Sequence, residues 1–62
     1  SDRDKVLYVE LIRSYRKMDS VDKAATLAFA TAIHNGSSAE EAREIANDIR
    51  RSNGKQVDES EE

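Results

Sequence analysis

Residues 33–42 of the chain read Ile-His-Asn-Gly-Ser-Ser-Ala-Glu-Glu-Ala and specify the end of one helix and the start of another. Asn35-Gly36 favours a helix terminus, because glycine adopts a positive φ without a Cβ clash. Ser37 and Ser38 can each accept a hydrogen bond from a free backbone N–H, and a glutamate follows each of them three residues later. This spacing is the capping box, in which the two side chains satisfy each other's backbone N–H groups. The chain is therefore predicted to be helical on both sides of a tight corner.

The chain is short, with 62 residues, no cysteine, no proline and a hydrophobic content of 37%. A domain of this size buries a smaller fraction of its surface than a larger domain does, and without cysteine no disulfide stabilises it. Eight of the larger apolar side chains lie between Val6 and Met18, whereas residues 39–52 contain only Ile45 and Ile49. We therefore expect one domain whose stability comes from packing that is completed by a second copy or by another protein.

Hydrophobic periodicity predicts three helices, at about residues 4–18, 21–34 and 39–52. The first helix is expected to be capped by Asp2 or Asp4. At 100° per residue, six of its large side chains share an arc about 140° wide. These six are Leu7, Tyr8, Leu11, Ile12, Tyr15 and Met18, while Val6 and Val9 fall outside the arc.

The second and third helices differ in how much of their circumference is apolar. Residues 21–34 are apolar nearly all round, with Leu27 opposite the main face, so this helix is predicted to be the buried centre. Residues 39–52 carry a narrow stripe of isoleucine and alanine, which predicts a surface helix. The expected fold class is all-α, a small three-helix bundle with short turns that spans residues 1–54. An alternative is that the first helix is exchanged between two copies of the chain.

The net charge of −3 is unevenly distributed along the chain. Residues 1–55 hold ten basic and nine acidic side chains, whereas residues 56–62 hold four acidic side chains and no basic one. Asn53-Gly54 repeats the pattern of the first helix stop, and no hydrophobic periodicity follows it. Low hydrophobicity with high charge is typical of disorder. Residues 55–62 are therefore predicted to form a flexible, disordered acidic C-terminal tail.

The sequence contains no run of about 20 apolar residues, the length that crosses a bilayer as a helix. It also lacks the basic region, apolar core and small-residue cleavage site of a signal peptide. We therefore expect a cytoplasmic protein that has no membrane partner.

No pattern of catalytic, cofactor-binding or metal-binding residues is visible. His34 is the sole histidine, and a zinc site needs several histidine or cysteine ligands. The two glycines are eighteen residues apart, so they cannot form a phosphate-binding loop. We expect a protein that is not an enzyme and binds no cofactor or metal, in which His34 interacts with the C-terminal end of a helix dipole.

The first helix has more apolar surface than one neighbouring helix is expected to cover. Tyr8 and Tyr15 lie seven residues apart on one edge of its apolar stripe, next to Ile12. Tyrosine beside aliphatic and basic residues is typical of protein-interface anchors, although such rings also suit the rim of a core. We therefore expect a protein-binding module that acts as a regulator, inhibitor, adaptor or assembly subunit. Its expected partner is another protein or a second copy of itself, bound by Tyr8, Val9, Ile12, Tyr15 and Arg16.

The alternative function is nucleic-acid binding through a helix-turn-helix formed by the second and third helices. Its outline is present, because Ala32 precedes Gly36 by four residues and apolar residues follow the glycine at six and nine positions. However, the helix that would enter the groove opens with Glu40, Glu41 and Glu44. Carboxylates at this position would be repelled by the DNA phosphates. Protein binding is therefore the favoured prediction.

Overall fold

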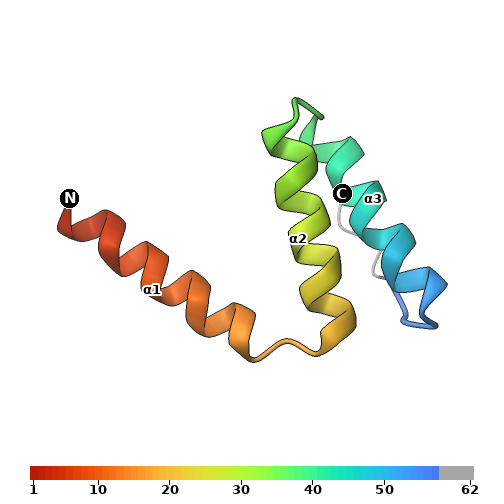
Figure 1. The fold of residues 1–62 in the computed structure, drawn as a ribbon, viewed down its shortest axis with the longest axis horizontal. Helices are drawn as coiled ribbons and strands as arrows, with labels where there is room; N and C mark the ends of the chain where they lie inside the picture. The colour runs from red at the N-terminus through yellow and green to blue at the C-terminus, as the bar shows by residue number, and fades with distance from the viewer. Residues whose placement is uncertain (58–62) are drawn as a thin grey trace.

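The computed structural model describes residues 1–57 and consists of three α-helices, α1 (Asp2–Arg16), α2 (Ser20–His34) and α3 (Ala39–Ser52) (Figure 1). No strand occurs among these residues. The predicted all-α fold class, with three helices and short turns, is therefore confirmed. The predicted bounds of α3 agree with the structure and those of α2 agree within one residue. Helix α1 begins and ends two residues earlier than predicted.

The start of α1 differs from the prediction because Ser1, rather than Asp2 or Asp4, caps the helix. The Ser1 hydroxyl oxygen accepts a hydrogen bond from the Asp4 backbone N–H at 3.2 Å. Asp2 and Asp4 lie inside the first turn instead, where their charges interact favourably with the positive end of the helix dipole. Serine and aspartate are comparable N-caps, so the sequence alone does not rank them.

The end of α2 is built as the sequence predicts. Gly36 has a φ of +99°. Its N–H donates to the Ile33 carbonyl at 3.0 Å, and the Ser37 N–H donates to the Ala32 carbonyl at 2.9 Å. These two hydrogen bonds form a Schellman motif, which satisfies the last free carbonyls of a helix. The corner therefore follows from local backbone chemistry.

Side-chain caps begin both α2 and α3. At α3, the Ser38 hydroxyl accepts from the Glu41 N–H at 3.0 Å and the Glu41 carboxylate accepts from the Ser38 N–H at 2.9 Å. Of the two candidate serines, Ser38 is thus the one that completes the capping box. At α2, an Asp19 carboxylate oxygen accepts from the Asp22 N–H at 2.8 Å. Each helix of this pair therefore has its start fixed by a residue adjacent in sequence.

A second Schellman motif ends α3. Gly54 has a φ of +76° and donates to the Arg51 carbonyl at 3.0 Å, while the Lys55 N–H donates to the Arg50 carbonyl at 2.9 Å. The motif turns the chain back toward the start of α2, so Lys55, which was assigned to the tail, forms ordered contacts described below. Residues 58–62 of the predicted acidic tail lie outside the described residues.

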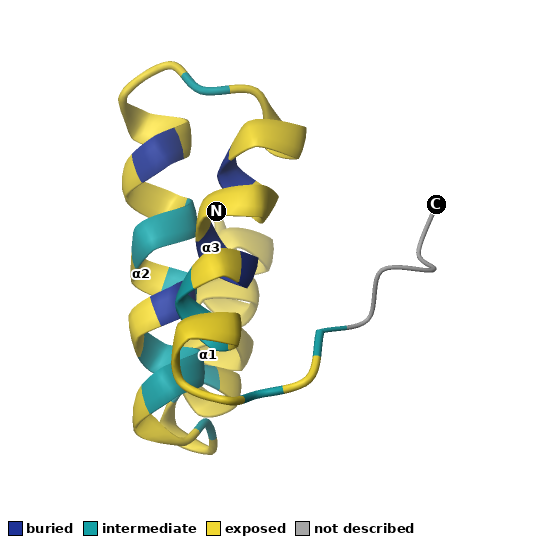
Figure 2. Ribbon diagram, turned by 90° about the vertical axis from the view of Figure 1, so that its right-hand side faces the viewer, coloured by how far each residue is buried: buried dark blue, intermediate teal, exposed yellow. Residues whose placement is uncertain are grey.

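Helix α3 runs beside α2 in the opposite direction, and the contact between them consists of alanines (Figures 1 and 2). Ala25 and Ala32 of α2 and Ala42 and Ala46 of α3 are buried, together with Asn47. Alanine has no atoms beyond Cβ, so the two backbones approach closely. No side chain larger than asparagine is buried among residues 1–57.

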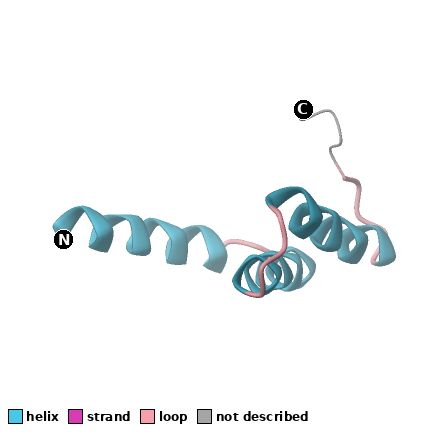
Figure 3. Cartoon of the chain, turned by 90° about the horizontal axis from the view of Figure 1, so that it is seen from above, coloured by secondary structure: helices cyan, strands magenta, loops and turns pink. Residues whose placement is uncertain are grey.

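Helix α1 extends away from α2 on the side opposite α3 (Figures 1 and 3). None of its residues is buried. Helix α2 is the central element, as predicted, because it lies between α1 and α3 (Figure 1). The prediction that it is buried is wrong, because α3 covers one side of α2 and Leu27 is exposed on another. Neither α1 nor any other helix within residues 1–57 has the length and hydrophobicity needed to cross a membrane.

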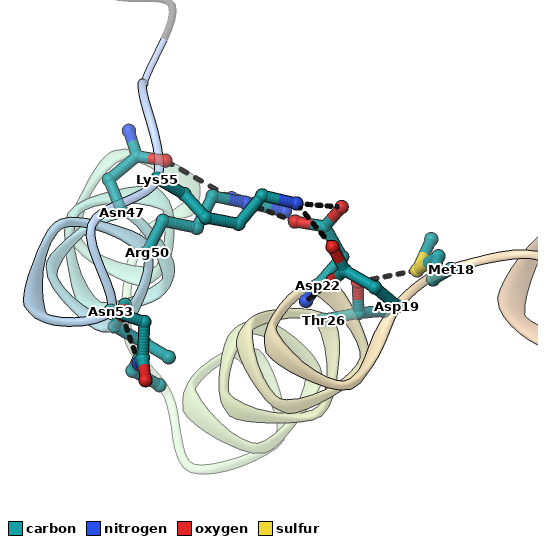
Figure 4. Close-up of polar contacts among 9 residues, drawn as sticks. Met18, Asp19, Asp22, Thr26, Asn47, Arg50, Asn53 and Lys55 are labelled. Carbon is teal, nitrogen blue, oxygen red and sulfur yellow. Dashed lines mark hydrogen bonds and ion pairs between the residues drawn. The ribbon is translucent and has the colours of Figure 1, made fainter.

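A polar cluster joins the start of α2 to the end of α3 (Figure 4). Arg50 Nε donates to Asp22 Oδ1 at 3.0 Å, and Arg50 Nη1 donates to the Asn47 side-chain oxygen at 3.1 Å. Lys55 Nζ donates to Asp19 Oδ2 at 2.7 Å and to Asp22 Oδ2 at 3.0 Å. Positive side chains thus lie at the C-terminus of α3 and negative ones at the N-terminus of α2, as both helix dipoles favour.

These contacts shift the pKa values of three groups in the cluster. The hydrogen bond from Lys55, followed by that from the Asp22 N–H, lowers the pKa of Asp19 below 3.8. Hydrogen bonds from Lys55 and then Arg50 lower the pKa of Asp22 below the same value. Hydrogen bonds to Asp19 and then Asp22 raise the pKa of Lys55 above 10.5. The cluster therefore stabilises the fold at a pH between the pKa values of its carboxyl groups and that of its lysine. This stabilisation is lost as the pH falls through the folded-state pKa values of Asp19 and Asp22, or rises through that of Lys55.

Replacing Lys55 by methionine is expected to lower the melting temperature at pH 7. It is also expected to reduce the fall in melting temperature that occurs as the pH is lowered. The wild-type melting temperature should fall as the pH drops below about 4, because protonated Asp19 and Asp22 no longer bond a cation. The variant lacks the largest cause of both pKa shifts, so the difference between its curve and that of the wild type should shrink as the pH falls. Circular dichroism melts from pH 2 to pH 9 measure this difference. Lys5→Met, on exposed α1, is the matched control and should run parallel to the wild type.

Candidate protein-binding surface

The five residues predicted to bind a partner occupy one face of α1. At 100° per residue they fall within an arc of about 120°, in the order Tyr15, Tyr8, Ile12, Arg16 and Val9. Tyr8, Val9, Ile12 and Arg16 are exposed, and Tyr15 is half-buried. The structure therefore brings all five onto one accessible side of the helix.

Tyr15 differs from the other four because it lies at the junction of α1 and α2. The Lys23 ammonium of α2 lies 5.5 Å from the centre of the Tyr15 ring, a cation–π distance. Beside it, the Thr26 hydroxyl donates to the Met18 sulfur at 3.3 Å (Figure 4). Through these contacts, the face of α1 that carries Tyr8 and Tyr15 is turned toward α2.

The accessible apolar surface is larger than the five predicted residues. Between Val6 and Ile12, all six large apolar side chains are between 46% and 67% exposed, namely Val6, Leu7, Tyr8, Val9, Leu11 and Ile12. Leu7 and Leu11 were placed in the apolar arc but not among the binding residues, and Val6 was placed outside the arc. One sequence signal could have identified them: a single helix contains seven large apolar side chains, and its neighbours are rich in alanine.

Charged residues border this surface at both ends of the helix. Asp2 and Asp4 lie in the first turn of α1 together with Arg3 and Lys5, and Arg13 and Arg16 lie in the last turn. Asp4 also lines a shallow hollow with Leu7, Tyr8 and Leu11, so it belongs to the apolar face itself. The α1 ion pairs are local and exposed, with Glu10 and Arg13 at 3.8 Å, and such pairs contribute little to stability.

The predicted alternative is a helix-turn-helix, whose second helix would need a basic face to bind DNA. Helix α3 has no basic face that would offset its acidic first turn. Glu40 and Glu41 are exposed in the first turn. At the other end, Arg50 is bonded to Asp22 at 3.0 Å and Arg51 Nη1 to Asp48 at 2.8 Å. These carboxylates partly neutralise the cations that a phosphate backbone would attract.

His34 is exposed in the last turn of α2, as its predicted interaction with the helix dipole requires. Within residues 1–57, no three histidine, aspartate or glutamate side chains come together as metal ligands. The described part of the chain therefore offers the α1 surface as its most extensive candidate site.

Comparison of the chain with models of known protein families, with curated protein sequences and with solved structures gave no match.

Proposed function

We propose that this protein functions by binding another protein through α1, as a non-enzymatic regulator, inhibitor, adaptor or assembly subunit. The observation that supports the proposal is the exposure of all six large apolar side chains of α1 between Val6 and Ile12. Isolated exposed apolar residues are ordinary, but a contiguous apolar patch on one helix is typical of an interaction site. The face with Tyr8, Ile12 and Arg16 combines the residue types that anchor protein interfaces.

The apolar surface of α1 is large enough to supply a substantial binding energy. Fully burying a large apolar side chain contributes roughly 1.5–3 kcal/mol. Covering the exposed half of each of six side chains therefore contributes about 1 kcal/mol per residue. Because α1 is already helical, little further ordering is needed to seat it in the groove of a partner, the mode in which amphipathic helices commonly bind.

Photocrosslinking at position 8 is expected to capture a protein. The experiment places a benzophenone amino acid at Tyr8 in the full chain, irradiates the producing cells and analyses the adducts by mass spectrometry. The matched control places the same amino acid at Arg43, an exposed position of α3. We expect adducts of defined mass from position 8 and not from position 43. Equal yields at the two positions, or no protein adduct at position 8, would contradict the proposal.

The identified adduct then permits a quantitative test with two purified proteins. Ile12→Ser removes apolar area from the centre of the surface and should weaken binding by about fivefold to tenfold. Measuring the same chain against duplex DNA at low salt separates protein binding from the nucleic-acid alternative. Binding of DNA that falls steeply with salt, together with no loss in the Ile12 variant, would favour that alternative.

A further inference from the structure

The backbone between α1 and α2 changes direction at the junction of Met18 and Asp19. Met18 continues the end of α1, because its N–H donates to the Tyr15 carbonyl at 3.1 Å. Asp19 belongs to α2, since its carboxylate accepts from the Asp22 N–H at 2.8 Å. Within residues 1–57, no hydrogen bond between backbone groups crosses this junction. The backbone therefore permits α1 to change its angle to α2 there.

Two side-chain contacts cross the same junction. The Lys23 ammonium lies 5.5 Å from the centre of the Tyr15 ring, and the Thr26 hydroxyl donates to the Met18 sulfur at 3.3 Å (Figure 4). Lys23 and Thr26 are three positions apart in α2, a spacing that places both on one side of the helix. Tyr15 and Met18 are also three positions apart. These junction contacts, Tyr15–Lys23 and Met18–Thr26, thus hold the end of α1 against one side of α2.

The junction contacts cover one end of the proposed binding surface. Of the five α1 residues predicted to bind a partner, Tyr15 is half-buried and the other four are exposed. A helix with its side chains is about 10 Å across, so a partner helix cannot lie along the Tyr15 ring while Lys23 occupies the space above it. Toward Tyr8 the two helices diverge (Figure 1). The closed junction therefore obstructs Tyr15 and leaves the rest of the surface accessible.

The closed arrangement is held weakly. None of the residues of α1 is buried, whereas α2 and α3 pack together and are joined by the polar cluster. An exposed cation–π contact favours the arrangement that contains it by about twofold to fivefold, and a thioether sulfur is a weak hydrogen-bond acceptor. We therefore expect the junction contacts together to favour the closed arrangement by about tenfold, which leaves a measurable open fraction.

We infer that the junction contacts are a latch that regulates the α1 surface. While the latch is closed it withholds Tyr15 from a partner, and a partner that binds the whole surface must open it. This inference rests on the proposed function and adds how access to that same site is controlled. Because binding of the whole surface requires the open form, a closed latch lowers the apparent affinity about tenfold.

Spin labels on α1 and α3 measure whether the latch sets the angle of α1. The chain contains no cysteine, so Arg3→Cys/Arg43→Cys places nitroxides at two exposed positions and nowhere else. We expect dipolar spectroscopy of this full chain to give one principal distance between the labels. Adding Lys23→Met and Thr26→Val removes the cation and the hydroxyl donor while keeping side chains of similar size. The fraction of chains away from the principal distance should then rise about fivefold.

The matched control is Lys5→Met/Thr31→Val in the same labelled chain. It makes the same two changes of residue type at exposed positions outside the junction and should leave the distances unchanged. Circular dichroism verifies that every variant keeps the wild-type helix content. Unchanged distances in the Lys23/Thr26 variant, or an equal change in the control, would overturn the latch.

The chain with benzophenone at position 8 tests whether the latch restricts binding. Lys23→Met/Thr26→Val in that chain should raise the yield of protein adducts, relative to the amount of chain, about threefold to tenfold, and the control pair should not. An opened junction with no gain in adducts would overturn the regulatory role. If none of these chains forms an adduct, the proposed function fails and the regulation fails with it. The label distances still decide whether the junction contacts hold α1.

Discussion

Replacing Ala25 by leucine is expected to lower the free energy of unfolding by about 1–3 kcal/mol, as is typical of overpacked cores. Ala25 of α2 is fully buried, as is Ala42 of α3, and α2 and α3 are the two helices that pack together. The larger side chain has no space there, so it must push the two helices apart or adopt a strained rotamer. Loss of this contact also separates the polar cluster, which bridges the same two helices.

Ala24→Leu provides the matched control, because position 24 is adjacent in sequence and exposed. Alanine and leucine have similar helix propensities, and exposed substitutions of this kind usually change stability by less than about 0.5 kcal/mol. Urea denaturation followed by circular dichroism compares the two variants at equal concentration. Equal stability of the two would show that α2 and α3 do not meet through Ala25.

Replacing Gly36 by valine is expected to lower the free energy of unfolding by about 1–3 kcal/mol, the typical cost of a sparsely populated backbone conformation. Gly36 has a φ of +99°, which a β-branched residue tolerates poorly. An added Cβ would meet no atom within 4 Å. The expected loss therefore comes from backbone conformation alone and not from a steric clash with the rest of the fold.

A D-alanine at position 36 separates these two causes. It adds a methyl group of the same size, in place of the other Cα hydrogen, and prefers positive φ. The synthetic chain should therefore be at least as stable as the wild type, because its unfolded state has less conformational freedom. Thermal unfolding of the D-alanine, L-alanine and valine chains compares them. Destabilisation by D-alanine as large as that by valine would show that space, rather than φ, limits position 36.

The helix ends were predictable because they depend on residues a few positions apart. Gly36 closes α2, and Ser38 with Glu41 opens α3, through hydrogen bonds within one turn. Ser1 was missed as the cap of α1 because the carboxylates beside it are equally good caps. The contacts of Lys55 were also missed, since its partners Asp19 and Asp22 are more than thirty residues away in sequence.

The candidate site was partly predictable. Periodicity and composition located Tyr8, Val9 and Ile12, which are exposed in the structure. The same periodicity placed Leu7 and Leu11 in the apolar arc but could not show that they are exposed, because it groups residues by face without indicating which face another helix will cover. Whether these residues bind a partner is the subject of the crosslinking and binding experiments.

The amino-acid sequence by itself determined the number, type and ends of the helices. These follow from φ preferences, caps and apolar spacing, whose energies are fixed within a few residues. Only the tertiary structure decided that α2 and α3 pair through alanines while α1 points away. The connection at residues 17–19 contains no glycine and no positive φ, so no local rule sets its direction. The direction of α1 depends on burial and polar contacts over the whole chain. Patterns within a few residues of sequence do not predict these contacts.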